Sequence, residues 1–522
     1  MKYSLRPWSI AALAFCALCI FCGALRAAPT PELRARVDTL LDQLEDPDAS
    51  VRMAADAQLN SLPGDAADLV EAAARRDDLG VEQTTKLRRA LTYLRPRAKT
   101  ELARKTRLDW EIKTFVAAYN AGGHMNQKDA PASRAALAAY VRFRDPWVGH
   151  RPEYRPALVR TFQKAVDAGT TDPLVLTLAT IADGRADLDE RWRDPDGSEI
   201  VSLKQVLNGP YPLIVKYYAE LGRLSVMSNW VVEWPRALEM LKELARDPSL
   251  PPRELDQLAV EFFDLAIDTL HDDKIVPAFV QIYTAAAPTS AYPLVLQAIG
   301  QARLAEQHVV GITNDADWKF FYDNLQQGED LLNKAWRMDP ADSRVAIAAL
   351  RLRTDQGMHG GGRESMETWF QRAISADPDS LTAYRLKLGF LYAHADDGHK
   401  AYLEFARDCL NTQDYHAGIP GVLMEAHLKL ADGSGDSAEY FARSDVWLDA
   451  QSFYETSLLN FPDNLKIHGE YAQFAAKCGH WDVVRTQCGI IGDKPTNPPF
   501  KSMESYNYLK KKAARLFAAP DK

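Results

Sequence analysis

The segment from His394 to His399 is the one short grouping of metal-ligating residue types in the chain. It reads His-Ala-Asp-Asp-Gly-His, so that two imidazoles flank the carboxylates of Asp396 and Asp397. Zinc takes three or four ligands at ~2.0–2.3 Å, and histidine and aspartate are among them. A solvated loop between helices has the same composition. We therefore assign no metal ligand and no catalytic residue. An enzyme or metal-dependent protein with a site near His394–His399 stays an alternative.

A glycine run, Gly360-Gly361-Gly362 with Arg363, precedes a predicted helix. The N–H groups at a helix N-terminus can hold an anion. The run lacks the Gly-Lys-Ser/Thr ending of a P-loop and follows a helix, so a turn between helices explains it better. The sequence also lacks the G-x-S-x-G, H-E-x-x-H and dinucleotide-binding motifs. The sequence therefore points to no particular reaction, and we expect no cofactor.

Arginine and aromatic residues gather in a proline-rich stretch at positions 142–156. Each proline restricts the residue before it, which favours turns and extended backbone. Arginine and aromatic side chains are the usual anchors of protein interfaces. A linker whose arginines pair with acids on neighbouring helices is the other interpretation. The candidate binding surface consists of Arg144, Trp147, His150, Arg151, Tyr154 and Arg155.

Residues 1–28 have the pattern of a secretory signal peptide. Lys2 and Arg6 precede an apolar run from residue 10 to residue 25, and small residues follow. The run is shorter than the ~20 residues that span a bilayer comfortably. We expect cleavage after Ala24 or Ala27 and export, to a bacterial periplasm. If the run is retained, the protein is a membrane-anchored structural scaffold instead.

The net charge of the chain limits the kinds of partner that it can bind. The chain has 522 residues and a net charge of −9, and loss of residues 1–28 removes three basic residues and no acid, which leaves −12. An acidic body is unsuited to nucleic acid, whose phosphates need a basic footprint. It is equally unsuited to an anionic membrane surface. We therefore expect a protein or peptide partner, with no nucleic acid and, after cleavage, no membrane.

Three cysteines, Cys409, Cys478 and Cys488, follow the predicted signal peptide. Cys478 and Cys488 flank a turn with an offset of roughly two helical turns, which exceeds the ~7 Å between Cα atoms that a disulfide allows. We expect buried free thiols. A bridge from Cys409 to one of the others stays open.

Helical periodicity predicts an all-α fold. Met366, Phe370 and Ala373 share one face of a helix, and Pro378 ends it. The same spacing recurs at Gly328, Leu332, Ala335 and Pro340, and at Ala450, Tyr454, Ser457 and Pro462. The pattern resembles tetratricopeptide repeats of about 34 residues with insertions. An α-solenoid of helix pairs follows from it, with a generic helical bundle as the alternative.

The N-terminal part resembles another helical repeat. The run DPDASVRMAADAQL at 46–59 places Val51, Ala55 and Leu59 on one face after an Asp-Pro turn. It is similar to a HEAT-type repeat. A second helix pair follows, at 66–76 and 82–94, and we expect Pro96 to end it because proline disrupts a helix interior.

A third resemblance covers about 90 residues that begin near Trp336. It rests on Trp336, Asp339-Pro340, Gly362-Arg363, Met366, Trp369-Phe370, Arg372-Ala373, Asp377-Pro378, Lys387, Phe405 and Cys409. Together these residues resemble an uncharacterised bacterial repeat-containing domain family. The resemblance implies helical repeats and supplies no activity or ligand.

We divide the chain into segments from these patterns. They are 1–28, signal peptide; 29–100, HEAT-like helical segment; 101–156, helix and linker; 157–310, helical repeat region; 311–490, tetratricopeptide-like repeats; and 491–522, C-terminal tail and capping helix. The function we expect is that of an exported helical-repeat scaffold that binds a protein or peptide.

Overall fold

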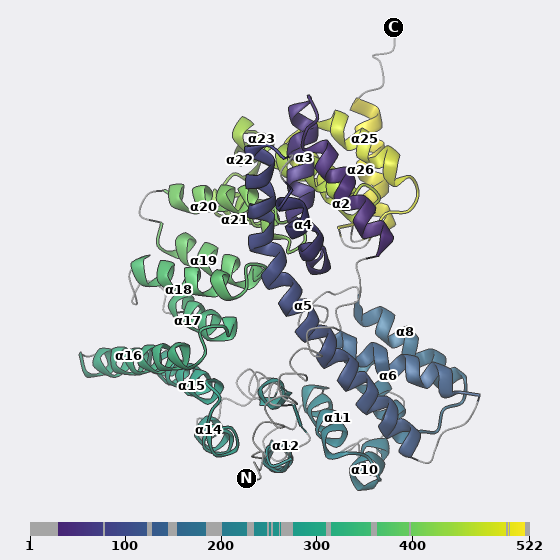
Figure 1. The fold of residues 1–522 in the computed structure, drawn as a ribbon, viewed down its shortest axis with the longest axis vertical. Helices are drawn as coiled ribbons and strands as arrows, with labels where there is room; N and C mark the ends of the chain where they lie inside the picture. Colours follow the sequence, from purple (N-terminus) through teal and green to yellow (C-terminus); the bar gives the residue numbers. More distant parts are fainter. Residues whose placement is uncertain are drawn as a thin grey trace, which may run out of the picture.

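The computed structural model confirms the all-α fold. It describes residues 30–76, 79–122, 128–144, 154–183, 201–226, 234–247, 250–251, 254–259, 262, 275–309, 315–355, 363–395, 398–496, 499–500 and 502–516. Within these ranges the regular secondary structure is helical and no strand occurs (Figure 1). The predicted signal peptide lies outside them. None of the helices described is both long and apolar enough to cross a membrane.

A first hydrophobic core lies in the N-terminal part of the chain. Its helices are α2 (Pro31–Gln43), α3 (Ala49–Asn60), the 3₁₀ turn η1 (Gly64–Ala66), α4 (Ala67–Ala74) and the first half of α5 (Val81–Ala121). Leu40, Leu59, Val70 and Leu94 are buried in it. Apolar residues three or four apart on each helix meet in this core, as the sequence pattern requires.

Helix α5 corrects the prediction that Pro96 ends a helix. The helix has 41 residues with Pro96 inside it, a length of about 60 Å at 1.5 Å per residue. It also runs across the segment boundary expected at residue 100. An interior proline costs ~3 kcal/mol. Leu94, Arg97 and Ala98 are all buried around Pro96, and this packing keeps the helix continuous.

The middle of the chain begins against the second half of α5, which contacts α6 and α11. Its helices are α6 (Ala130–Arg144), α8 (Tyr154–Asp167), α9 (Pro173–Asp183), α10 (Val201–Asn208), α11 (Leu213–Val226), α12 (Trp234–Leu244), a short helix at 254–259, α14 (Ile275–Ala286) and α15 (Tyr292–Val309). Phe115 of α5 packs against Tyr140 of α6 and Tyr218 of α11. These contacts anchor the far end of α5.

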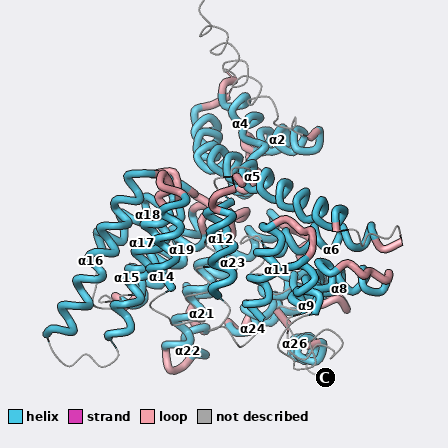
Figure 2. Tube along the Cα trace, turned by 90° about the horizontal axis from the view of Figure 1, so that it is seen from below, coloured by secondary structure: helices cyan, strands magenta, loops and turns pink. Residues whose placement is uncertain are grey.

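The rest of the chain forms a series of helices side by side (Figures 1 and 2). They are α16 (Asp315–Met338), α17 (Ser343–Asp355), α18 (Arg363–Ala376), α19 (Leu381–Ala393), α20 (Lys400–Asn411), η5 (Ile419–Gly421), α21 (Val422–Gly433), α22 (Ser437–Phe441), α23 (Ser444–Asn460), α24 (Leu465–Lys477), α25 (Trp481–Ile491) and α26 (Met503–Leu516). The predicted helix phases are confirmed, because Leu332, Phe370, Ala373, Ala450 and Tyr454 are all buried.

The two ends of this helical series meet. Most helix contacts join neighbours or next neighbours along the chain, but α3 also packs against α23 and α5 against α11. In Figure 1, α5 leads away from α2–α4 toward α6 and α11. The chain therefore runs out along α5 and returns through α12–α19 to its own N-terminal part.

The three cysteines are free thiols in the structure. Cys409 and Cys488 are buried and Cys478 is half-buried. Burial raises the pKa of Cys409 to about 12 and that of Cys478 to about 11. Because the thiolate is the reactive form, these thiols are poor nucleophiles at neutral pH.

Candidate functional site

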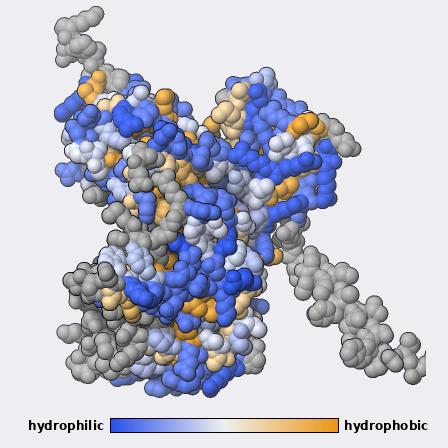
Figure 3. Space-filling view, turned by 90° about the vertical axis from the view of Figure 1, so that its left-hand side faces the viewer, coloured by the Kyte–Doolittle hydropathy of each residue, from blue (hydrophilic) through white to orange (hydrophobic). Residues whose placement is uncertain are grey.

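A large cavity lies inside the circuit that the helices complete. It has a volume of about 3430 Å³. The lining residues come from α5, the end of α6, the residues around 244–257, the start of α15, α17, α19, the segment 415–418 and α24. Elements far apart in the sequence thus line one cavity, which is open to solvent. The outer surface in Figure 3 is mostly hydrophilic, with hydrophobic residues scattered over it.

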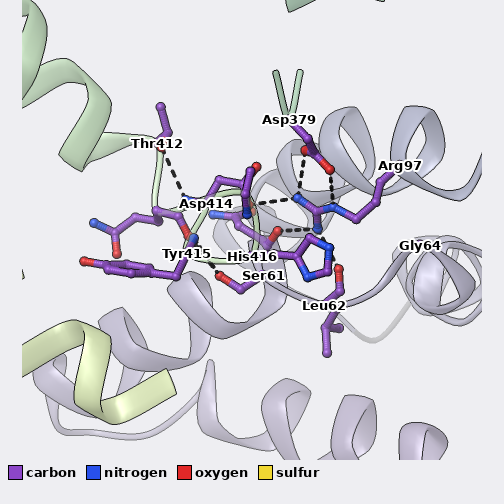
Figure 4. Close-up of polar contacts among 12 residues, drawn as sticks. Ser61, Leu62, Gly64, Arg97, Asp379, Thr412, Asp414, Tyr415 and His416 are labelled. Carbon is purple, nitrogen blue, oxygen red and sulfur yellow. Dashed lines mark hydrogen bonds and ion pairs between the residues drawn. The ribbon is translucent and has the colours of Figure 1, made fainter. Parts of the chain in front are cut away.

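Beside this cavity, α5 is joined to the C-terminal half of the chain through Arg97 (Figure 4). Its Nε donates to Asp379 Oδ2 at 2.7 Å, and its Nη2 donates to Asp379 Oδ1 at 3.0 Å and Asp414 Oδ1 at 2.9 Å. Its Nη1 donates to the carbonyls of Asn60 at 2.9 Å and Leu62 at 2.6 Å. We call these five residues the Arg97 clasp. All five N–H donors of the guanidinium have an acceptor.

The Arg97 clasp is buried and contains more acid than base. Arg97 is 2% exposed, and Asp379 and Asp414 are buried as well. Burial raises the pKa of Asp414 to about 7 against the lowering effect of Arg97, and the carboxylate of Asp379 adds to the rise. Burial and Asp379 likewise raise the pKa of Asp377 to about 6. The carboxyl of Asp414 is therefore only partly ionised at neutral pH, although it accepts a hydrogen bond from Arg97.

Weaker contacts surround the clasp. Ser61 Oγ donates to the carbonyl of Gln413 at 3.1 Å and accepts from the N–H of Tyr415 at 3.1 Å. Arg89 Nη2 donates to the carbonyl of Asn411 at 2.8 Å. These contacts dock the N-terminal helices on the segment 411–416, more than 300 positions further along the chain.

Close backbone packing supports the same junction. The N–H of Gly64 donates to Glu101 Oε2 at 2.9 Å, and Glu101 Oε1 lies 3.5 Å from Nε2 of His416. A Cβ on Gly64 would lie 2.4 Å from the backbone of Ala98. Glycine is therefore required where η1 meets α5, because backbone atoms of a helix cannot move aside as a flexible side chain can.

A second charged cluster, the Glu111 junction, fixes the far half of α5. Arg107 Nη1 donates to Glu111 Oε1 at 2.7 Å, and Arg144 Nη1 lies 3.8 Å from Glu111 Oε2. The guanidinium of Arg144 lies 3.4 Å from the ring centroid of Tyr218, whose hydroxyl donates to Glu254 Oε1 at 2.6 Å. The junction thus joins α5, α6, α11 and the helix at 254–259.

Glu254 holds a proton at neutral pH. Burial, and then the negative charge of Glu111, raise its pKa to about 8. A carboxyl that shares a buried site with another carboxylate cannot ionise freely.

The predicted binding surface is only partly within the described residues. Arg144 lines the cavity as a member of the Glu111 junction. Arg155 lies on α8, where its Nε donates to the carbonyl of Ala182 at 3.1 Å. The two arginines share no partner in these contacts. Trp147, His150 and Arg151 lie outside the described residues, as does the side chain of Tyr154.

The histidines of the hypothetical metal site pack on aromatic rings. The ring of His394 stacks on Phe390 at 4.0 Å, and that of His399 lies 4.9 Å from Tyr392. Asp396 and Asp397 lie outside the described residues, as does the glycine run at 360–362. Within the described ranges, no group of three His, Cys, Asp or Glu residues is placed to hold a metal ion.

No pattern in the sequence predicts the Arg97 clasp. Arg97 is separated from Asp379 by 282 positions and from Asp414 by 317, and no motif links residues so far apart. One signal was Arg97 beside Pro96 in a helix. A buried charge there needs a partner, and an interior proline needs packing that offsets its cost. No family model matches the chain, and no curated protein does either.

Proposed function

We propose that the protein is an exported binding scaffold that holds a segment of another protein, or a peptide, in its central cavity. In this proposal the helix pairs are HEAT-like in the N-terminal part and tetratricopeptide-like in the C-terminal part. They form an α-solenoid whose ends are joined at the Arg97 clasp. The observation that supports the proposal is the open cavity of about 3430 Å³ that residues from these distant helices line together.

The size of the cavity favours a macromolecular segment. Pockets for small molecules and cofactors usually measure about 300–1,000 Å³. This cavity is several times larger and is lined by both charged and apolar side chains, including Arg95, Trp110, Ile347 and Arg385. A mixture of this kind is typical of protein interfaces. Helical repeats commonly present their concave surface to a partner.

We also propose that the protein is exported to a periplasm. Its support is the N-terminal pattern of basic residues, apolar run and small residues. A partner in the same compartment is then expected. N-terminal sequencing of the cell-derived protein tests this part, and an intact Met1 on membrane-bound protein contradicts it.

Site-specific photo-cross-linking tests the binding site. A photoreactive residue is placed at Ala103, which is exposed and lines the cavity. The matched control places it at Lys105, which is exposed on the same helix and does not line the cavity. Each mature variant is irradiated in envelope extract of its source cells.

We expect a discrete adduct from position 103 and none from position 105, and an excess of unlabelled mature protein should compete it away. Equal adducts from both positions, or none from position 103, would overturn the proposed site. Mass spectrometry of the adduct identifies the segment of the partner that lies in the cavity.

A further inference from the structure

The N-terminal helices form a body with a hydrophobic core of its own. The buried apolar residues of α2–α4 and the first half of α5, from Val37 to Ala98, pack together as one cluster. The main cluster begins at Phe115 of α5 and extends to Phe474 of α24. Within the described part of the chain, no buried apolar residue belongs to both clusters. The N-terminal body therefore buries its apolar surface without help from the main core.

An exposed stretch of α5 joins the two cores. Residues 99–110, which we call the bridge segment, include no buried residue. A helical stretch of this length has marginal stability in water when it lacks packing. Val81, at the start of α5, lies 18 positions before the bridge segment, or about 27 Å away. A bend of about 20° in the bridge segment would therefore move Val81 by about 9 Å.

The contacts that hold the N-terminal body against the C-terminal half are mainly polar. They are the ion pairs of the Arg97 clasp, the two hydrogen bonds of Ser61 with residues of the segment 411–416, and the hydrogen bond from Arg89 to that segment. Helix α3 also packs against α23. Polar groups that pair across an interface give up contacts with water, so their net contribution is small. Such a junction can open at a much lower cost than either core.

Contacts within the N-terminal body keep Arg97 in place to re-form the clasp. Its Nη1 donates to the carbonyls of Asn60 and Leu62, which belong to the same body. These two hydrogen bonds persist when the carboxylates of the other half move away. The side-chain amide of Asn60 is buried and has no hydrogen-bond partner in the described part of the chain. A buried amide without a partner costs free energy until water reaches it.

The junction is part of the cavity wall. Arg95 and Lys99 line the cavity on the side of α5, and Asp379, Tyr415 and His416 line it on the side of the C-terminal half. Separation of the two sides would widen the cavity here. A segment from the middle of a partner chain could then enter sideways, without the threading of a chain end.

We infer that the N-terminal body is a gate, which turns about the bridge segment and parts from the C-terminal half at the Arg97 clasp to admit the partner segment to the cavity. The entry of a partner rests on the proposed function, whereas the movement does not. Local opening that leaves the cores intact is common where few apolar contacts cross a junction. Hinged closure around a ligand is one of the usual conformational changes of proteins.

Energy transfer between two dyes measures the opening in the absence of any partner. The dyes are attached at Met53→Cys on α3 and Leu448→Cys on α23, where the native side chains are 71% and 62% exposed. The control pair joins Met53→Cys to Val81→Cys, within the N-terminal body, where Val81 is 87% exposed. The three cysteines of the mature chain are replaced by alanine in both proteins. A thermal melt verifies that each labelled protein is folded.

We expect transfer between positions 53 and 448 to fall at urea concentrations that leave the control pair and the far-ultraviolet dichroism unchanged. Arg97→Ala should raise the ratio of open to closed molecules in water by about a hundredfold or more. Arg89→Ala should raise the ratio by about fivefold or less. If both dye pairs and the dichroism change in one transition, or Arg97→Ala leaves the ratio unchanged, the gate is wrong.

A covalent lock tests whether the opening admits the partner. Carbodiimide treatment of the variant His416→Lys should join residue 416 to Glu101, whose carboxylate lies 3.5 Å from the imidazole of His416. The same treatment of the chain that retains His416 is the matched control. A photoreactive residue at position 103 then reports binding in envelope extract. We expect the locked protein to form at least about fivefold less adduct than the control, because its binding-competent state is depleted.

The outcomes distinguish the gate from the proposed function. Equal adducts from the locked and control proteins would mean that the partner enters elsewhere, which overturns the gate and leaves the cavity as a binding site. If position 103 gives no adduct in either protein, the proposed function fails and the entry of a partner through the gate fails with it. The dye pairs alone then decide whether the N-terminal body opens.

Discussion

Replacement of Arg97 by alanine should release the N-terminal helices from the C-terminal half. The change leaves the carboxyls of Asp379 and Asp414 and the carbonyls of Asn60 and Leu62 without their shared donor, at a site that is 2% exposed. Removal of one partner from a buried ion pair costs ~3–5 kcal/mol, because the remaining charge is buried and uncompensated. We expect a loss of this size in the stability of the junction.

The matched control lies on the same helix. Arg89 also reaches across the junction, through a 2.8 Å hydrogen bond to the carbonyl of Asn411, but its side chain is 42% exposed. Exposed pairs contribute ~0–1 kcal/mol, so Arg89→Ala should be mild. Asp414→Asn should be mild too, because burial raises the pKa of Asp414 to about 7 and the neutral amide has the same shape.

Hydrogen exchange read by mass spectrometry is the assay. In Arg97→Ala, amides of residues 49–66 and 411–416 should exchange faster, while those of α24 and α25 should keep their protection, because these helices do not touch the clasp. If Arg97→Ala and Arg89→Ala change exchange equally, the Arg97 clasp does not hold the junction.

Three further predictions follow from packing and charge. Phe370→Ala should cost ~3–5 kcal/mol, because the ring is buried against Tyr384 and Phe405 at 5.2 and 5.5 Å. Phe320→Ala, at a side chain 40% exposed, should change urea-unfolding stability by ~0.5 kcal/mol or less. Gly64→Ala should be destabilising, because the added Cβ would meet the backbone of Ala98. A Cβ at Gly489 would meet nothing within 4 Å, so Gly489→Ala should leave the stability unchanged or raise it by up to ~1 kcal/mol. Equal melting temperatures of the two glycine variants would count against the close approach. Glu254, whose pKa is raised to about 8 from 4.5, binds a proton in the native state that the unfolded chain lacks. Its contribution to stability should therefore be present at about pH 5 and be lost as the pH rises through about 8. Glu254→Gln should flatten this part of the stability profile, and an unchanged slope would show that Glu254 is not the group.

Local features of the fold could be predicted from the sequence, and distant ones could not. The spacing of Phe370 and Ala373, or of Tyr454 and Ala450, fixes which face of a helix is apolar, because neighbours on a helix are three or four positions apart. That face is buried in the structure. The effect of Pro96 depends instead on burial around it, which no local rule contains.

The candidate site illustrates the same limit. The sequence predicts that Arg144 belongs to a binding surface, because it lies among aromatic residues. The structure places it on Tyr218 and near Glu111, residues from two other helices. Likewise, Asp379 and Asp414 occupy loops that resemble any solvated turn in sequence, and only the return of the chain places them against Arg97. Charge clusters assembled from remote elements require the fold to be known first.

The closed circuit is the central claim, and zero-length cross-linking tests it most directly. His416 Nε2 and Glu101 Oε1 are 3.5 Å apart, although 315 positions separate them. In the variant His416→Lys, carbodiimide treatment should join residues 416 and 101 by an amide bond that peptide mass spectrometry detects. The pair Lys387 and Glu367, 2.7 Å apart on neighbouring helices, is the control in the same sample. Cross-links at both pairs are expected. A cross-link between residues 387 and 367 without one between 416 and 101 would mean that the circuit is open in solution.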